Sequence, residues 1–568
     1  MRGFVAFGLV ALLATLAAAD TTVPPAARAF LDKADLAREE GHLEEAAGLY
    51  RKAIEGHGLY HQAHAGYLAT LRGLGDMVPA AALYSRLVGE HPNSVELKAF
   101  QAASLDPQDA ANTLETLAGE HGGNLRVQLE LARALLRAGN PRNAQKAAKE
   151  ALKIDPDSSL GRILMGDSFF ARRSYAKARK EYKIAVDNDP SYIPGQLRMA
   201  YCFHKMKKST EGLRILARLL SEDNLPRLVA AHWMLVYIRA DMGKFDDAVK
   251  AIDKILEIDK DDVDVVMAKG RLLLRARKPM EAAKVFRALT EKRKNMAEAF
   301  FAQGWAYEKA ADAPEIQNKP AQQKERLIAA MNAYTKCTEM DPTVRPRDSL
   351  GFVLLLGEEH AEALTQLKRA ADIDPNAATT RNNIGLAQDI ADNRKLAKAA
   401  YERVLKKIDK NNIRARVMLA LSYYLDGSSA KAIKELTAVL KRAPNDDLAW
   451  TFLGDVHWDS RKHSRALSAY KKAVDINDKN FAAWYHMGIV YDDRKKDEDA
   501  DRCLRKALEA NASPPAALLL LLGQLNDDDA LNNLKDALGF FQLYLELGGT
   551  EDWVPDAIKR IDDALKGK

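Results

Sequence analysis

The alternation of apolar and polar positions is clearest between residues 447 and 514, where one pattern occurs twice. Apolar and small side chains recur at three- and four-residue steps, which places them on one face of a helix. A polar stretch interrupts each copy, Asp459 to His463 in the first and Arg494 to Asp497 in the second. Each copy therefore predicts two helices joined by a turn. The matching positions, which lie 34 residues apart, are Trp450, Leu453, Gly454, Ala466, Tyr470 and Ala473, followed by Trp484, Met487, Gly488, Ala500, Leu504 and Ala507.

The small residues of this pattern predict close contact between helices, because a larger side chain at Gly454 would hold the two helices apart. The period and the order of Trp, Leu, Gly, Tyr and Ala resemble the tetratricopeptide repeat (TPR), a helix–turn–helix unit. The resemblance implies an all-α fold, a right-handed α-solenoid of about 14–15 TPR hairpins with a C-terminal capping helix. Such a fold suits 568 residues, which are too many for one compact core.

The same frame extends through nearly the whole chain, with one irregularity in the ninth repeat. Its second-helix markers Ala330, Tyr334 and Cys337 come about 14 residues later than the period requires. An insertion explains the delay, and it is either a tolerated loop or a docking element. The expected segments are a signal peptide at 1–19, a lead-in at 20–26, repeats 1–9 (first part) at 27–310, the insertion at 311–326, the rest of repeat 9 through repeat 15 at 327–550, and the capping helix at 551–568.

The N-terminus predicts export. An uncharged apolar run from Phe4 to Leu16 precedes three alanines and Asp20, which is typical of a cleaved signal peptide. The alternative is an uncleaved membrane anchor. After cleavage no segment is expected to span a membrane. The three cysteines are sparse and odd in number, so they indicate no disulfide framework. We therefore expect the periplasm, with the cell surface or secretion as alternatives.

Charge is uneven along the chain. Residues 125–218 hold 20 Lys and Arg against 9 Asp and Glu, whereas residues 20–124 hold 8 against 15. A basic middle favours a partner with negative charge near repeats 4–8. The resemblance implies that first helices line the concave surface, and there arginines and aromatic rings are typical of binding hot spots. The alternative is that several rings only complete the core between helices. The expected groove residues are Arg126, Arg133, Arg137, Phe170, Tyr201, His204, Lys205, Trp233, Tyr237, Arg271, Arg275, Phe301 and Trp305.

Motifs for chemistry are not evident. There is no Gly-rich phosphate loop, and the spacing of Ser428 and Lys431 lacks the other motifs of a Ser–Lys nucleophile. His57, His61 and His64 have spacing that could suit a metal, but no carboxylate or cysteine completes the set. We therefore predict no catalytic residue, no metal, no cofactor and no enzymatic activity. No nucleic-acid recognition motif is present either, and we expect no nucleic-acid partner.

The resemblance extends to exported bacterial TPR scaffold proteins. It implies a non-catalytic scaffold that mediates protein–protein interactions in a cell-envelope assembly, such as surface motility, pilus, outer-membrane or polysaccharide-export machinery. An alternative is a module that binds an anionic glycan through the basic groove of repeats 4–8.

Overall fold

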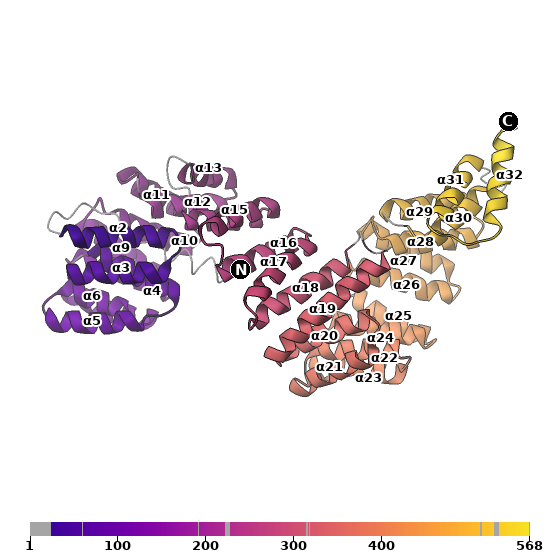
Figure 1. Ribbon diagram of the computed structural model, residues 1–568, viewed down its shortest axis with the longest axis horizontal. Coiled ribbons are helices and arrows are strands. Elements are labelled where there is room, and N and C mark those ends of the chain that lie inside the picture. The colour runs from indigo at the N-terminus through magenta and orange to yellow at the C-terminus, as the bar shows by residue number, and fades with distance from the viewer. Residues whose placement is uncertain are drawn as a thin grey trace. The chain divides into compact units, whose positions relative to one another are not determined.

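The computed structural model describes residues 24–566 except 59–60, 191, 222–227, 314–315, 317–318, 512–513 and 528–532. Within these residues all regular elements are helical (Figure 1), which confirms the all-α prediction. The expected signal peptide at 1–19 lies outside them. None of the helices in the described part is both long and apolar enough to cross a membrane.

The chain divides into two compact units, residues 1–277 and 278–568. In the described part of unit 1 the helices form consecutive pairs, followed by one further helix. They are α2 (Pro25–Glu39) with α3 (Leu43–Gly56), α4 (His61–Leu74) with α5 (Val78–Glu90), α6 (Val95–Ala103) with α7 (Pro107–Glu120), α8 (Leu125–Arg137) with α9 (Pro141–Ile154), α10 (Ser159–Ala171) with α11 (Tyr175–Asn188), α12 (Ile193–Lys205) with α13 (Ser209–Leu219), α14 (Val229–Asp241) with α15 (Phe245–Ile258), and then α16 (Val263–Arg275).

Unit 2 begins with α17 (Pro279–Lys292), which completes the eighth repeat in sequence. Its further helices are α18 (Ala297–Ala311) with α19 (Pro320–Met340), α20 (Val344–Leu356) with α21 (His360–Ile373), α22 (Ala378–Ile390) with α23 (Arg394–Arg403) and its π-helical continuation η2 (Val404–Ile408), α24 (Ile413–Leu425) with α25 (Ser429–Leu440), α26 (Asp447–Asp459) with α27 (His463–Ile476), α28 (Phe481–Asp493) with α29 (Asp497–Ala510), α30 (Ala516–Asp527) with α31 (Leu534–Glu546), and the single helix α32 (Val554–Lys566). The described helices thus make fifteen repeats and a C-terminal helix, as the period predicts.

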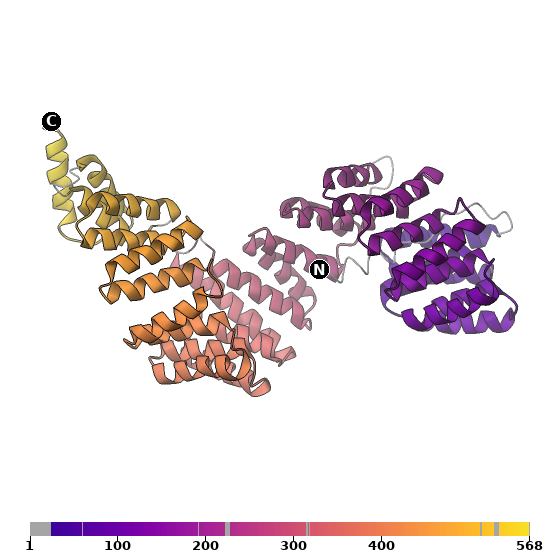
Figure 2. The same ribbon diagram turned by 180° about the vertical axis from the view of Figure 1, so that it is seen from behind.

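Successive hairpins stack in the manner of a solenoid within each unit (Figures 1 and 2). The second helix of one hairpin packs against the first helix of the next, and the first helices of neighbouring hairpins also touch one another. In unit 1 this contact runs through α4, α6, α8, α10, α12 and α14. We call these six helices the first-helix row of unit 1. Side chains on adjacent members of the row can therefore meet although they lie more than thirty residues apart in sequence.

Helix ends follow the repeat period. Asn412, Asp446 and Asn480 are 34 residues apart, and each caps a first helix by accepting a hydrogen bond from a backbone N–H three residues on. The first helices end on a residue with positive φ, which satisfies the last carbonyl groups. Glycine fills this place at Gly139, but Lys207 fills it at φ 62°, a conformation that costs an L-residue free energy.

Close contact inside each hairpin depends on the glycine that the pattern singles out. A Cβ placed on Gly454 would lie 2.3 Å from the ring of Tyr470, and one on Gly166 would lie 2.4 Å from the ring of Tyr182. Both tyrosines are almost fully buried. The glycine therefore leaves the space that the aromatic ring of the second helix occupies, as the sequence predicts.

The ninth repeat contains the extra residues expected at 311–326. The second helix of this repeat, α19, already begins at Pro320, so residues 320–326 are helical. Proline suits the first position of a helix because its missing N–H would have no partner there. Ile316 is buried, and Arg326 donates a 2.7 Å hydrogen bond to the carbonyl of Ala310. The described part of this segment therefore packs on its own repeat.

Candidate functional site

The structure places eleven of the thirteen expected groove residues in unit 1 and the other two, Phe301 and Trp305, in unit 2. Those of unit 1 lie on α8, α10, α12, α14 and α16. Eight of these eleven fall into two groups. We call them the arginine cluster, which adds Arg72 and Glu130 to three expected arginines, and the ring cluster, made of Phe170, Tyr175, Tyr201, His204, Lys205 and Tyr237.

The arginine cluster surrounds the carboxylate of Glu130, whose side chain is fully buried on α8. Arg133 donates from Nη1 to both oxygens of Glu130 at 2.9 and 3.0 Å. Arg126, one turn earlier on the same helix, lies 3.7 Å from Oε1. Arg72 and Arg137 both donate to the carbonyl oxygen of Ala103, at 2.7 and 3.2 Å. Helices α4 and α8 thus bring four guanidinium groups around one carboxylate.

Positive charge dominates the electrostatics of this cluster. Burial alone would raise the pKa of Glu130, but Arg133, Arg126 and the other two arginines hold it below its usual value. Burial, together with Arg137 and Arg133, lowers the pKa of Arg72 to about 9. Burial also lowers the pKa values of Arg126 and Arg137. A lowered arginine pKa means that the surroundings do not fully compensate the positive charge.

The ring cluster continues along the first-helix row. Phe170 stacks on Tyr201 with ring centroids 5.2 Å apart, and Tyr201 meets Tyr237 edge-on at 5.5 Å. The ammonium group of Lys205 donates to the hydroxyl of Tyr237 at 2.5 Å and lies 5.0 Å from the centres of both tyrosine rings. His204 is bonded to Asp241 at 3.1 Å. Residues that the sequence suggested one by one therefore form a continuous surface on α10, α12 and α14.

Burial governs the titration of the ring cluster. It raises the pKa of Tyr201 to about 12, with a contribution from the hydrogen bond to Tyr237. Burial also lowers the pKa of His204, although Asp241 opposes this shift. Lys205 has a raised pKa because its hydrogen bond to Tyr237 outweighs burial. The cluster therefore contains a cationic lysine and a histidine that favours its neutral form near neutral pH.

The remaining expected groove residues do not join these clusters. Arg275 is exposed and lies over the ring of Phe245 at 4.7 Å. Arg271 is exposed, and Trp233 is half-buried among the apolar residues of its own unit. In unit 2, Phe301 packs on Tyr334 and under Arg345, so it completes the core between helices.

Trp305 remains 40 % exposed. It therefore offers an aromatic surface in unit 2 that is separate from the two clusters of unit 1.

The sequence analysis missed a polar arrangement that recurs in both units. Tyr182 donates to Asp167 at 2.8 Å, and Arg198 on the next first helix donates to both oxygens of Asp167. Asp455 likewise holds Tyr470 and His486, each at 2.7 Å. The carboxylate precedes its tyrosine by 15 residues and its basic partner by 31 in both cases. That double spacing is a signal that the sequence contains.

His64 is a packing residue. Its ring stacks on Phe100 at 4.7 Å, Nε2 donates to the carbonyl of Gly58 at 2.9 Å, and Nδ1 lies 3.2 Å from the hydroxyl of Tyr84. Burial lowers its pKa to about 3. Among the described residues no group of three or more His, Cys, Asp or Glu is arranged to hold a metal.

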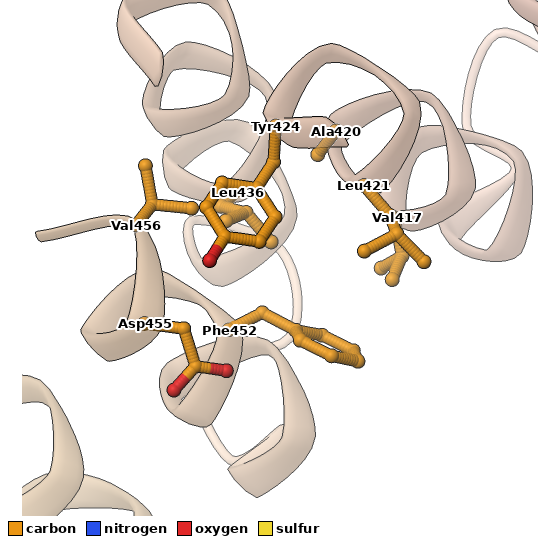
Figure 3. A pocket seen from close by; sticks show the side chains of 8 residues that line it. All are labelled: Val417, Ala420, Leu421, Tyr424, Leu436, Phe452, Asp455 and Val456. Carbon is orange, nitrogen blue, oxygen red and sulfur yellow. The ribbon is translucent and has the colours of Figure 1, made fainter. Parts of the chain in front are cut away.

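Figure 3 shows an apolar cavity in unit 2 between α24, α25 and α26. Val417, Leu421, Tyr424 and Phe452 are among its lining residues, and its volume is about 10 Å³. This is room for about one water molecule. The cavity therefore does not hold a small-molecule substrate.

Comparison with known proteins identifies the class of protein. The chain belongs to the tetratricopeptide repeat family, and TPR proteins bind other proteins. The tetratricopeptide repeat matches residues 10–60, 31–95, 129–193, 267–315 and 417–481 in one form, and 229–262 and 481–514 in another.

Individual relatives share the repeat but little sequence. Anaphase-promoting complex subunit 3 of Schizosaccharomyces pombe is 24% identical over 124 residues, which are 22% of this chain and 18% of that protein. Tetratricopeptide repeat protein 37 of Xenopus laevis is 22% identical over 73% of this chain, and the match covers 26% of that protein. The chain thus spans about a quarter or less of the length of these relatives. The crystal structure of yeast Tom70 is 13% identical, with 86% of this chain and 96% of that chain covered and a TM-score of 0.41.

Proposed function

We propose that this protein is a non-catalytic scaffold that holds partner proteins of a bacterial cell-envelope assembly on the first-helix row of unit 1. The observation that carries the proposal is the continuity of that row, where the arginine cluster and the ring cluster lie on α4, α8, α10, α12 and α14. Arginines and aromatic rings provide the directed hydrogen bonds and rigid area that protein partners use. The N-terminal pattern of residues 1–19 supports the envelope as the location.

A site-specific crosslinking experiment tests the proposal. A photoreactive residue replaces Tyr201 in the ring cluster, and the matched control replaces Lys149, which is exposed on the second helix α9. Crosslinking in the native envelope should capture a defined partner from position 201 and not from position 149. The same products from both positions would contradict a binding role for the row.

Export is tested separately. The first 19 residues are fused to a reporter enzyme that is active only outside the cytoplasm. Reporter activity, with the signal removed from the mature chain, supports the envelope location. An inactive reporter, with the full chain recovered in the cytoplasm, would contradict it.

A second candidate function is binding of an anionic polysaccharide. The excess of Lys and Arg in residues 125–218 favours it. Binding should then weaken steeply as salt is added. Replacement of the exposed Arg271 by Glu should reduce it. Absent or salt-insensitive binding to the polysaccharide would remove this candidate.

A further inference from the structure

The arginine cluster holds more positive charge than its own structure needs. Glu130 neutralises one of four guanidinium groups, and Arg133 alone supplies the short hydrogen bonds to both carboxylate oxygens. Arg72 and Arg137 converge on a single carbonyl oxygen, that of Ala103. A carbonyl oxygen has two lone pairs and no net charge. Two of the four arginines are thus held at the site without a carboxylate of their own.

Three donor atoms in this cluster have no hydrogen-bond partner. They are Nε of Arg72, Nη2 of Arg133 and Nε of Arg137, and all three are shielded from solvent. A buried donor without a partner typically costs about 1–3 kcal/mol. Arg162 and Arg198 each leave one such atom, but each pairs with a carboxylate of its own. Within the described residues, three unpartnered donors come together in this cluster alone.

Other charges near the cluster leave it positive. Glu96 on α6 lies near Arg126, but it also accepts a 2.6 Å hydrogen bond from Asn124. Asp106, which precedes α7, lies near Arg137. With Glu130 these carboxylates still number one fewer than the arginines. The field at the cluster therefore attracts an anion, and the three free donors offer it hydrogen bonds.

We propose that the arginine cluster binds an acidic segment of a partner protein, with a carboxylate of that segment accepting hydrogen bonds from Arg72, Arg133 and Arg137. Glu130 is a positioning residue, because its contact with Arg133 sets where the guanidinium group points. This inference rests on the proposed scaffold function and specifies the chemistry of its ligand. Guanidinium groups bind carboxylates with fixed geometry, which provides orientation as well as affinity.

The neighbouring ring cluster favours a peptide over a sugar chain. A sugar stacks on an open aromatic face, but Phe170 already stacks on Tyr201, and Lys205 lies over the rings of Tyr201 and Tyr237. The rings mainly present apolar edges. Such edges suit an apolar side chain, so we expect the segment to carry an aromatic or aliphatic residue beyond its acidic residues.

Binding of synthetic peptides to the purified full chain tests the inference. The probe is a peptide with blocked ends that contains several Asp and Glu and one Phe, and its control replaces the acids by Asn and Gln. The acidic peptide should bind, and the neutral peptide should not. Arg133→Gln should weaken the binding at least about tenfold, since a hydrogen bond to a charged group is lost. Arg142→Gln is the matched control, because Arg142 is exposed on α9 of the same repeat, and it should leave the affinity unchanged.

Glu130→Gln separates ligand binding from a structural role. If the arginines bind the peptide through their charge, loss of the Glu130 carboxylate should keep the affinity or raise it. If Arg133 only supports the fold by pairing with Glu130, both substitutions should weaken binding alike, and the inference is wrong. Should Arg133→Gln fail to fold, Arg126→Gln takes its place, because the Arg126 side chain is 19% exposed and lies farther from Glu130, at 3.7 Å.

Three outcomes overturn the inference. They are equal affinity for the acidic and neutral peptides, loss of binding on Arg142→Gln, and binding of an acidic oligosaccharide without binding of the acidic peptide. Crosslinks from position 201 that persist while no acidic peptide binds would leave the scaffold function standing and refute the acidic ligand. Peptide binding without any crosslinked envelope partner would support the acidic ligand and count against the envelope function.

Discussion

Gly454→Ala should destabilise the thirteenth repeat although alanine favours helices. The added Cβ would lie 2.3 Å from the Tyr470 ring, far inside van der Waals contact. The ring has little room to move, because its hydroxyl donates to Asp455 at 2.7 Å and Asp455 also holds His486. Overpacking of this kind costs about 1–3 kcal/mol, whereas helix propensity returns about 0.5–1 kcal/mol. We expect a net loss of about 1–2 kcal/mol.

Hydrogen exchange followed by mass spectrometry measures this loss locally, which suits a solenoid whose repeats differ in stability. Peptides from α26 and α27 should exchange about 5–30 times faster in the variant. Gly539→Ala is the matched control, because Gly539 also lies inside a helix but no atom is within 4 Å of its added Cβ. That variant should slow exchange in α31. If Gly454→Ala slowed exchange as well, the close approach of helix and ring would not be limiting, and our reasoning would be refuted.

Three further predictions concern backbone, histidine and thiol groups. Lys207→Gly should stabilise unit 1 by about 1 kcal/mol in chemical denaturation, because glycine adopts positive φ without the steric cost. The pKa of His64 is about 3 in the fold and near 6.5 in an unfolded chain, so the unfolded chain alone takes up a proton as pH falls below 6.5. The parent should therefore lose about 2 kcal/mol more than His64→Phe between pH 7 and pH 5, and equal losses would contradict the assignment. Burial raises the pKa values of Cys202, Cys337 and Cys503 to about 11, so a thiol reagent at neutral pH should label them only after denaturant is added.

The fold could be predicted from the sequence because each repeat states its packing locally. The 34-residue spacing of Gly454 and Gly488 reports the tight places, and the caps Asp446 and Asn480 report the helix starts. The start of α19 at Pro320 was less evident, because the polar residues around it are equally typical of a loop. The unit boundary after Arg277 lies in the turn of a repeat, and no change of composition marks it.

The candidate site was only partly predictable, because its geometry depends on neighbours in other repeats. Arg126, Arg133 and Arg137 follow from their places on a first helix, and the structure brings them together. Their partners Arg72 and Glu130 were missed. Arg72 belongs to α4, and whether it reaches α8 depends on how each hairpin rotates against the next, which the pattern within one repeat does not contain.

Net charge along the chain is therefore a weak guide to where a ligand binds. Much of the basic excess in residues 125–218 is used inside the fold, as in the pairs of Arg162 with Glu181 and Arg198 with Asp167. Such pairs satisfy their charges and attract no partner. The arginine cluster differs because its positive charge exceeds its carboxylates and three of its donors are buried without partners. Unsatisfied donors are costly for the protein alone and are satisfied when an anion binds, so they locate the ligand site more sharply than the charge count does.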